Sequence, residues 1–159
     1  MICTIDDYFS SNRKNSFTDM KDFQYCLWLM IDDENGDFET MDFTPHISIQ
    51  TNMDENFLPK SPPQLSEPLV VQLGENIQSD WTDNFFAIYY PVHLISVKKP
   101  KWWRESMHVS VFYAYDKEYD IETVLQSPLD QLGGKTYTCS TIKLFDCHGH
   151  FKTWKEKTL

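Results

Sequence analysis

The chain of 159 residues has only 5 glycines and lacks an apolar run long enough to cross a bilayer. Its best candidate, Tyr25 to Ile31, is about a third of the roughly 18 to 20 residues that a membrane-spanning helix needs. The first residues contain neither a basic nor an apolar segment, so we expect no secretory signal. The low glycine content and the 15% of aromatic residues argue against disordered and collagen-like chains. We therefore expect a single folded domain over residues 1–159, located in the cytoplasm.

Positive charge is also scarce. The chain has 14 lysines and arginines against 24 aspartates and glutamates, for a formal net charge of -10. Binding to duplex nucleic acid or to an anionic membrane needs clustered positive charge, so this composition argues against both partners. Any nucleotide partner is therefore expected to be small or locally held, and the sequence does not specify the oligomeric state.

The 4 cysteines form no Cys-x-x-Cys pair, and without export we expect them to be free thiols. Cys147, His148 and His150, with Cys139 before them, are the residues that resemble a zinc cluster most. Structural zinc sites usually show two separated paired motifs, whereas three of these residues fall in one tight predicted turn. The sequence therefore predicts neither a bound metal nor a cofactor.

The apolar pattern predicts an α+β domain built on antiparallel sheet. Asn35-Gly36 is a strong hairpin signal after a first strand, and four prolines between Asn52 and Pro68 indicate an irregular loop. The amino-terminal residues are expected to form a short helix or an arm. The expected strands are 23–31, 38–51, 69–73, 84–95 and 107–115, followed by a helix from Asp120 to about Gly133 and a closing hairpin over 136–146 and 151–154.

Two of these strands carry the same short pattern, His46-Ile47-Ser48 and His108-Val109-Ser110. Side chains two positions apart on a strand point to the same face, so each histidine projects beside its serine. The residues between them point to the other face, into a core. Each motif is therefore a polar pair on a hydrophobic backing, and the two pairs meet in one groove if their strands are neighbours.

Two histidines and two hydroxyls suit the cleavage of a phosphodiester without a metal ion. One neutral imidazole removes a proton from the attacking oxygen, and one protonated imidazole donates a proton to the leaving oxygen. The hydroxyls of Ser48 and Ser110 hydrogen-bond the phosphate oxygens. The sequence does not decide whether His46 or His108 is the base.

A short turn before the second motif concentrates basic and aromatic residues: Lys98, Lys99, Lys101, Trp102, Trp103 and Arg104. Aromatic faces stack on nucleobases, and cations bind phosphates. We therefore expect Trp102, Trp103, Lys101 and Arg104 to bind the substrate. Tyr113 and Tyr115 alternate away from His108 along their strand, so we expect both in the core.

The paired motifs resemble those of the two-histidine (2H) phosphoesterase superfamily, the LigT-like fold. That superfamily carries two His-x-Thr/Ser motifs on strands of two pseudo-symmetric lobes, and serine replaces the commoner threonine in both motifs here. The resemblance extends over residues 23–145 as an order of elements. It implies a two-lobed antiparallel sheet with few helices and a catalytic groove between the lobes, with His46 and His108 as catalytic residues and Ser48 and Ser110 as phosphate contacts.

The motif spacing and short helices look most like the compact viral branch of this superfamily. Members of that branch degrade 2′,5′-oligoadenylate or cyclic dinucleotides that serve as immune signals. The resemblance therefore implies a 2′,5′-phosphodiesterase acting on 2′,3′-cyclic GMP-AMP or 2′,5′-oligoadenylate in the host cytosol. Three alternatives stay open: a 2′,3′-cyclic phosphodiesterase acting on RNA ends, a non-catalytic module that sequesters a nucleotide, and an interaction protein in which the motifs are coincidental.

Overall fold

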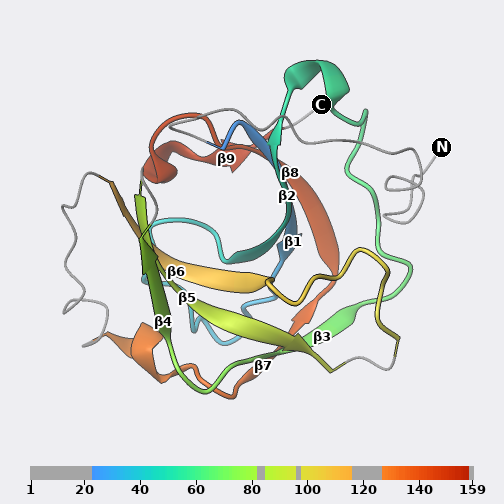
Figure 1. Ribbon diagram of the computed structural model, residues 1–159. Coiled ribbons are helices and arrows are strands. Elements are labelled where there is room, and N and C mark those ends of the chain that lie inside the picture. Colours follow the sequence, from blue (N-terminus) through green and yellow to red (C-terminus); the bar gives the residue numbers. More distant parts are fainter. Residues whose placement is uncertain (1–22, 82–84, 96–97, 116–126, 158–159) are drawn as a thin grey trace.

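The computed structural model describes residues 23–81, 85–95, 98–115 and 127–157 (Figure 1). This part of the chain forms nine strands and three short 3₁₀ helices. The strands are β1 (Tyr25–Met30), β2 (His46–Met53), β3 (Leu69–Leu73), β4 (Gln78–Trp81), β5 (Phe85–Leu94), β6 (His108–Tyr115), β7 (Thr136–Cys139), β8 (Thr141–Asp146) and β9 (Lys155–Glu156). The helices are η1 (Glu55–Phe57), η2 (Pro128–Gln131) and η3 (Phe151–Thr153).

The strands form one sheet in the order β7-β3-β5-β6-β2-β1-β8-β9, with β4 paired to β5 beside this path. The strand ladders are antiparallel. β7 and β8 lie far apart in this order, although only Ser140 separates them in the chain. The sheet must therefore curl until β7 approaches β1 and β8, and the amide of Asp32, just after β1, donates to the carbonyl of Thr138 in β7 at 2.9 Å. This curled half-barrel with few helices fits the expected α+β class, and the two-lobed LigT-like arrangement stays a prediction.

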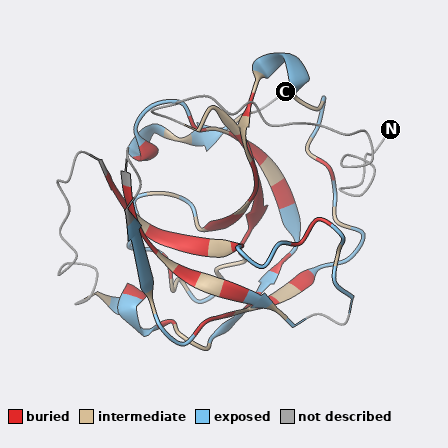
Figure 2. Cartoon of the chain, in the orientation of Figure 1, coloured by how far each residue is buried: buried red, intermediate tan, exposed pale blue. Residues whose placement is uncertain are grey.

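The two faces of the sheet carry different side chains. Along β2, Ile47 and Ile49 belong to the main hydrophobic core, whereas His46 and Ser48 lie on the opposite face. Figure 2 shows buried residues along the central strands and exposed ones mainly on the connections. Smaller apolar clusters, one of which includes Trp28, lie on the polar face. Because the main core orients the strands, it determines which residues of each motif reach that face.

The Asn35-Gly36 turn does not join two strands directly, so the predicted hairpin is wrong in this detail. β1 and β2 do pair, but residues 31–45 connect them. Within this connection the Asp33 carboxylate accepts hydrogen bonds from the amides of Asp37 (2.7 Å) and Phe38 (3.0 Å). Such local bonds compete with strand pairing, and the strand expected from Phe38 therefore begins only with β2.

Other boundaries also differ from expectation. β4 was not predicted because the residues from Gln78 to Asp80 are polar and exposed, without apolar alternation. The closing hairpin, expected between 136–146 and 151–154, is confirmed only in part, since β8 pairs with β9 just beyond the expected second strand. Residues 136–146 form two strands with different partners, because β7 pairs with β3 and β8 also pairs with β1. The segment 151–154 contains η3 instead of a strand, because the His150 side chain caps this helical turn.

Two expected elements fall on residues outside the described part. These are the amino-terminal helix or arm and the start of the helix expected from Asp120. Of that helix, the described residues include η2, which Ser127 caps by accepting a hydrogen bond from the amide of Leu129. Between β2 and β3 the proline-rich segment contains the short helix η1, a single bridge residue at Gln64 and otherwise irregular chain, which confirms its prediction.

Candidate active site

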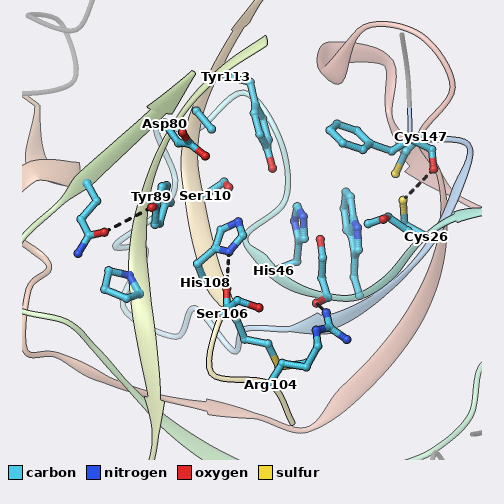
Figure 3. A pocket seen from close by; sticks show the side chains of 18 of the residues that line it. Cys26, His46, Asp80, Tyr89, Arg104, Ser106, His108, Ser110, Tyr113 and Cys147 are labelled. Carbon is cyan, nitrogen blue, oxygen red and sulfur yellow. Dashed lines mark hydrogen bonds between the residues drawn. The ribbon is translucent and has the colours of Figure 1, made fainter. Parts of the chain in front are cut away.

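Polar and aromatic side chains line a groove of about 580 Å³ on the face of the sheet opposite the main core. This volume lies in the usual range for ligand sites. Predicted site residues that line the groove are His46, Ser48, Arg104, His108 and Ser110. Figure 3 shows the rings of His46 and His108 beside each other, between Tyr113 and Arg104.

The pairing of β2 with β6 brings the two motifs together. Ile47 pairs with Val109, so the central residues of the motifs lie opposite each other. In an antiparallel ladder the flanking residues then face in crossed order, which places His46 across from Ser110 and Ser48 across from His108. The two motifs are thus related by an approximate twofold axis through the Ile47–Val109 pair, and each histidine has both serines as neighbours.

Each histidine is held in the same way by the backbone just before it. Nδ1 of His46 is 2.7 Å from the carbonyl oxygen of Thr44, and Nδ1 of His108 is 2.9 Å from that of Ser106. A carbonyl oxygen only accepts, so Nδ1 carries the hydrogen in both rings. This leaves both Nε2 atoms available for proton transfer, as in metal-free acid–base catalysis.

The environment of His46 favours its neutral form. Its side chain is 3% exposed, and its ring stacks on the indole of Trp28 with centroids 3.3 Å apart and planes within 5°. Trp28 in turn stacks on Phe145 at 4.0 Å. Burial, with a smaller contribution from nearby His108, lowers the pKa of His46 from 6.5 to about 3, against the raising effect of the Thr44 carbonyl. His46 is therefore a neutral proton acceptor in the resting protein.

His108 lies in a more open place. Its side chain is half-buried, and its ring contacts Tyr89 at a centroid distance of 4.8 Å. Solvent and ligand can both reach this ring from the groove, so the twofold arrangement of the backbone does not extend to the surroundings of the two imidazoles. The two histidines therefore differ in how far each is open to the groove.

The two serines present free hydroxyl groups to the groove. Ser110 is buried and Ser48 is half-buried, and both line the groove between the histidines. Neither hydroxyl is hydrogen-bonded to another residue of the described part. A ligand oxygen that enters between the imidazoles can therefore accept hydrogen bonds from both hydroxyls.

Arg104 supplies a fixed positive charge beside Ser48. One of its guanidinium nitrogens donates to the carbonyl of Ile49 at 2.8 Å, and another donates to the carbonyl of Ser48 at 3.3 Å. Partial burial lowers the pKa of Arg104, but guanidinium stays charged in proteins. Since the backbone of β2 holds the group in place, its remaining donors can meet an anion without a large loss of side-chain freedom.

The other residues predicted to bind the substrate do not line the groove. Trp102 and Trp103 are buried within the main hydrophobic core, on the side of the sheet away from the histidines. Lys101 is exposed and does not contribute to the groove walls either. The residues of the basic and aromatic turn 98–104 therefore lie in different places. Both indoles belong to the core, and Arg104 lines the groove.

A β-bulge places Tyr113 on the groove face, contrary to the expectation that it lies opposite His108, although its side chain is buried as expected. Phe112 pairs with Ile88, but the next pair joins Ser110 to Tyr89, so β6 has one extra residue at Val111. Val111 and Phe112 both pack on the main core, and Tyr113 returns to the face of Ser110. Alternation along the strand gave no sign of this irregularity.

Sequence reasoning also missed the aromatic walls formed by Trp28 and Tyr89. Trp28 lies in a run that is apolar at every position, so no alternation distinguished a core face from a groove face. Tyr89 was missed for the same reason, because its strand is aromatic at several positions. Trp154 and Phe23 line the groove as well, from segments next to β9 and β1.

The remaining histidines and cysteines form no metal site in the described residues. There, no three side chains of histidine, cysteine, aspartate or glutamate are grouped closely enough to hold a metal ion. Nδ1 of His148 instead contacts the carboxylate of Asp146 at 2.7 Å, and His150 caps η3. Cys26, Cys139 and Cys147 are buried and form no disulfide within the described residues.

Comparison with known proteins adds no assignment to this geometry. The helices in the described ranges are too short to cross a membrane. No family model, curated protein or solved structure matches the chain.

Proposed function

We propose that this protein is a metal-independent phosphodiesterase that cleaves 2′,5′-linked signalling nucleotides such as 2′,3′-cyclic GMP-AMP or 2′,5′-oligoadenylate. One observation carries the proposal. Both histidines donate Nδ1–H to the carbonyl two residues before them, while both line one groove. The resemblance to 2H phosphoesterases belongs to the same proposal, and so does an action in the cytoplasm against immune signalling.

The reaction begins with His46 as the base. A 2′,5′ linkage leaves the vicinal 3′-hydroxyl next to the phosphorus, and Nε2 of His46 removes its proton. The 3′-oxygen then forms a bond to phosphorus. The anionic phosphodiester and the face of Trp28 both stabilise the imidazolium that results, which opposes the effect of burial on the pKa of His46.

The reaction ends with His108 as the acid. The bond from phosphorus to the 5′-oxygen breaks, and Nε2–H of His108 gives its proton to that oxygen. The products are a 2′,3′-cyclic phosphate and a free 5′-hydroxyl. The hydroxyls of Ser48 and Ser110 and the guanidinium of Arg104 stabilise the negative charge on the non-bridging oxygens.

The fixed groove predicts selectivity for the linkage. Moving the attacking oxygen to the adjacent ribose carbon displaces it by more than the ~1 Å that already costs about 10²-fold in rate. We therefore expect 3′,5′ bonds to be cleaved at least about 10²-fold more slowly than 2′,5′ bonds. The experiment incubates the protein, with excess EDTA, with 2′,3′-cyclic GMP-AMP, 2′,5′-oligoadenylate and all-3′,5′ controls, and resolves the products by mass.

The same experiment separates the alternatives. Activity that disappears with EDTA and returns with zinc contradicts the metal-free mechanism. Recovery of all nucleotides unchanged, with tight binding, favours a sequestering module. Equal cleavage of both linkages contradicts the selectivity while leaving a phosphodiesterase in place.

Arg104→Met should raise the Michaelis constant and lower kcat/KM by about 10- to 100-fold, because the groove loses its fixed cation. Arg104→Lys keeps the charge but not the fork that binds the Ser48 and Ile49 carbonyls, so its activity should lie between those of Arg104→Met and wild type. Lys101→Met is the matched control, since Lys101 lies outside the groove. Equal kinetics for the two methionine variants would remove Arg104 from the site.

A further inference from the structure

The groove extends beyond the catalytic groups into a notch at Ala87. Asp80 of β4 pairs with Ala87 of β5, and Ala87 pairs with Tyr113 of β6. All three residues line the groove. Alanine has a single side-chain carbon, and Ala87, which packs with Tyr113 and Phe151, still lines the groove between the carboxylate on one side and the phenol ring on the other. We call this space the Ala87 notch.

The Ala87 notch lies next to the proton-transfer groups. The neighbouring row across the same strands contains Gln78, Tyr89 and Ser110, and Ser110 is the serine opposite His46. Figure 3 shows Asp80 and Tyr113 on the side of the histidines away from Arg104. A nucleotide whose phosphate lies among Ser48, Ser110 and Arg104 can therefore reach the Ala87 notch with its base.

The polar groups at the notch have a defined pattern. The Tyr89 hydroxyl donates to Oε1 of Gln78 at 3.3 Å, so the amide nitrogen of Gln78 is left to donate to a ligand. Asp80 is exposed and, within the described residues, makes no hydrogen bond or ion pair. The strand β4 thus offers one donor and, two residues further on, a carboxylate with two free acceptor oxygens.

We infer that the Ala87 notch is a nucleobase subsite that prefers guanine, an inference that rests on the proposed function. Guanine has two adjacent donors, N1–H and N2–H, beside the acceptor O6. The Asp80 carboxylate accepts from both donors, the Gln78 amide donates to O6, and Tyr113 contacts the base from the side. Adenine and the pyrimidines place no two adjacent donors on this edge, so they satisfy the carboxylate only in part.

The charge of the subsite supports a neutral base over a second phosphate. Asp80 would repel an anion, whereas Arg104 and the histidines lie on the other side of Ser110. The groove therefore offers the guanidinium of Arg104 to the phosphodiester, and the carboxylate of Asp80 to a group rich in N–H donors. Among the common bases, this division of charge favours guanine.

The test is a calorimetric titration of the protein with guanosine, inosine and adenosine 5′-monophosphates. Inosine differs from guanosine only by the missing N2 amine, so it isolates one bond to Asp80. We expect the guanosine nucleotide to bind about tenfold or more tightly than either other nucleotide. Asp80→Asn should remove most of this preference, and Ala87→Leu should weaken binding of all three because it fills the notch.

Asp130→Asn is the matched control, because Asp130 is also exposed but lies outside the groove. It should keep the wild-type preference. Equal affinity for the three nucleotides, an absence of binding, or a preference that survives Asp80→Asn would overturn the subsite. These binding results do not depend on turnover, so a failure of the subsite is distinct from a failure of the phosphodiesterase proposal, which the product analysis above detects.

Discussion

Replacing His46 or His108 by asparagine should lower turnover of a 2′,5′-linked dinucleotide by about 10²- to 10⁴-fold. Each substitution removes an Nε2 atom that transfers a proton. The asparagine amide can still donate to the carbonyl of Thr44 or Ser106, as Nδ1 does in the wild type. The loss should therefore appear in kcat more than in the Michaelis constant, measured by initial rates at saturating substrate.

His93→Asn is the control for this pair, because His93 is exposed on β5 and lies outside the groove. It should retain wild-type kinetics. Circular dichroism and thermal unfolding check that all three variants fold. Wild-type turnover in a folded His46 or His108 variant would exclude that histidine from the reaction. The proposed mechanism would then lack its base or its acid.

Acidification should destabilise the fold through His46. Its pKa is about 3 in the folded protein, against an ordinary value of 6.5. Between these values the unfolded chain binds a proton that the folded chain does not, so the free energy of unfolding falls as pH decreases from about 6.5 toward 3. Above about pH 6.5 this contribution is fully present. At about pH 4.5 it should have decreased by about 2 to 3 kcal/mol relative to about pH 7.5.

The measurement is the free energy of unfolding in urea at both pH values, for wild type and for His46→Asn. Carboxylates titrate in this range as well, so the difference between the two proteins isolates His46. His46→Asn should lose less stability on acidification than the wild type. The same loss in both proteins would show that His46 is not held neutral by burial, and the assignment of base and acid would then lose its support.

Much of the sheet follows from local pattern. Apolar and aromatic content predicted β3 and β5 closely, and alternation predicted β6 and the opposite faces of Ile47 and Ser48 in β2. This succeeds because strand geometry depends on the nearest residues. The same pattern predicted two polar pairs on a hydrophobic backing, and the structure brings both pairs into one groove.

Patterns failed where a residue's place depends on distant partners. Trp102 and Trp103 have aromatic rings suited to stacking on a nucleobase, but both are buried in the main hydrophobic core. Tyr113 changed faces because the bulge at Val111 accommodates β5, and β4 is a polar strand that exists only by pairing with β5. A sequence window contains none of these partners.

By itself, the sequence determined the two His-x-Ser motifs, the scarcity of positive charge and the strands with one polar face. Only the tertiary structure decided how the two equivalent histidines differ. The antiparallel pairing of β1 with β2 places the indole of Trp28 over His46, whereas β5 leaves His108 beside Tyr89 and open to the groove. Since desolvation depends on all neighbouring atoms, the burial that lowers the pKa of His46 arises only after the strands have paired, although the two motifs are alike in sequence.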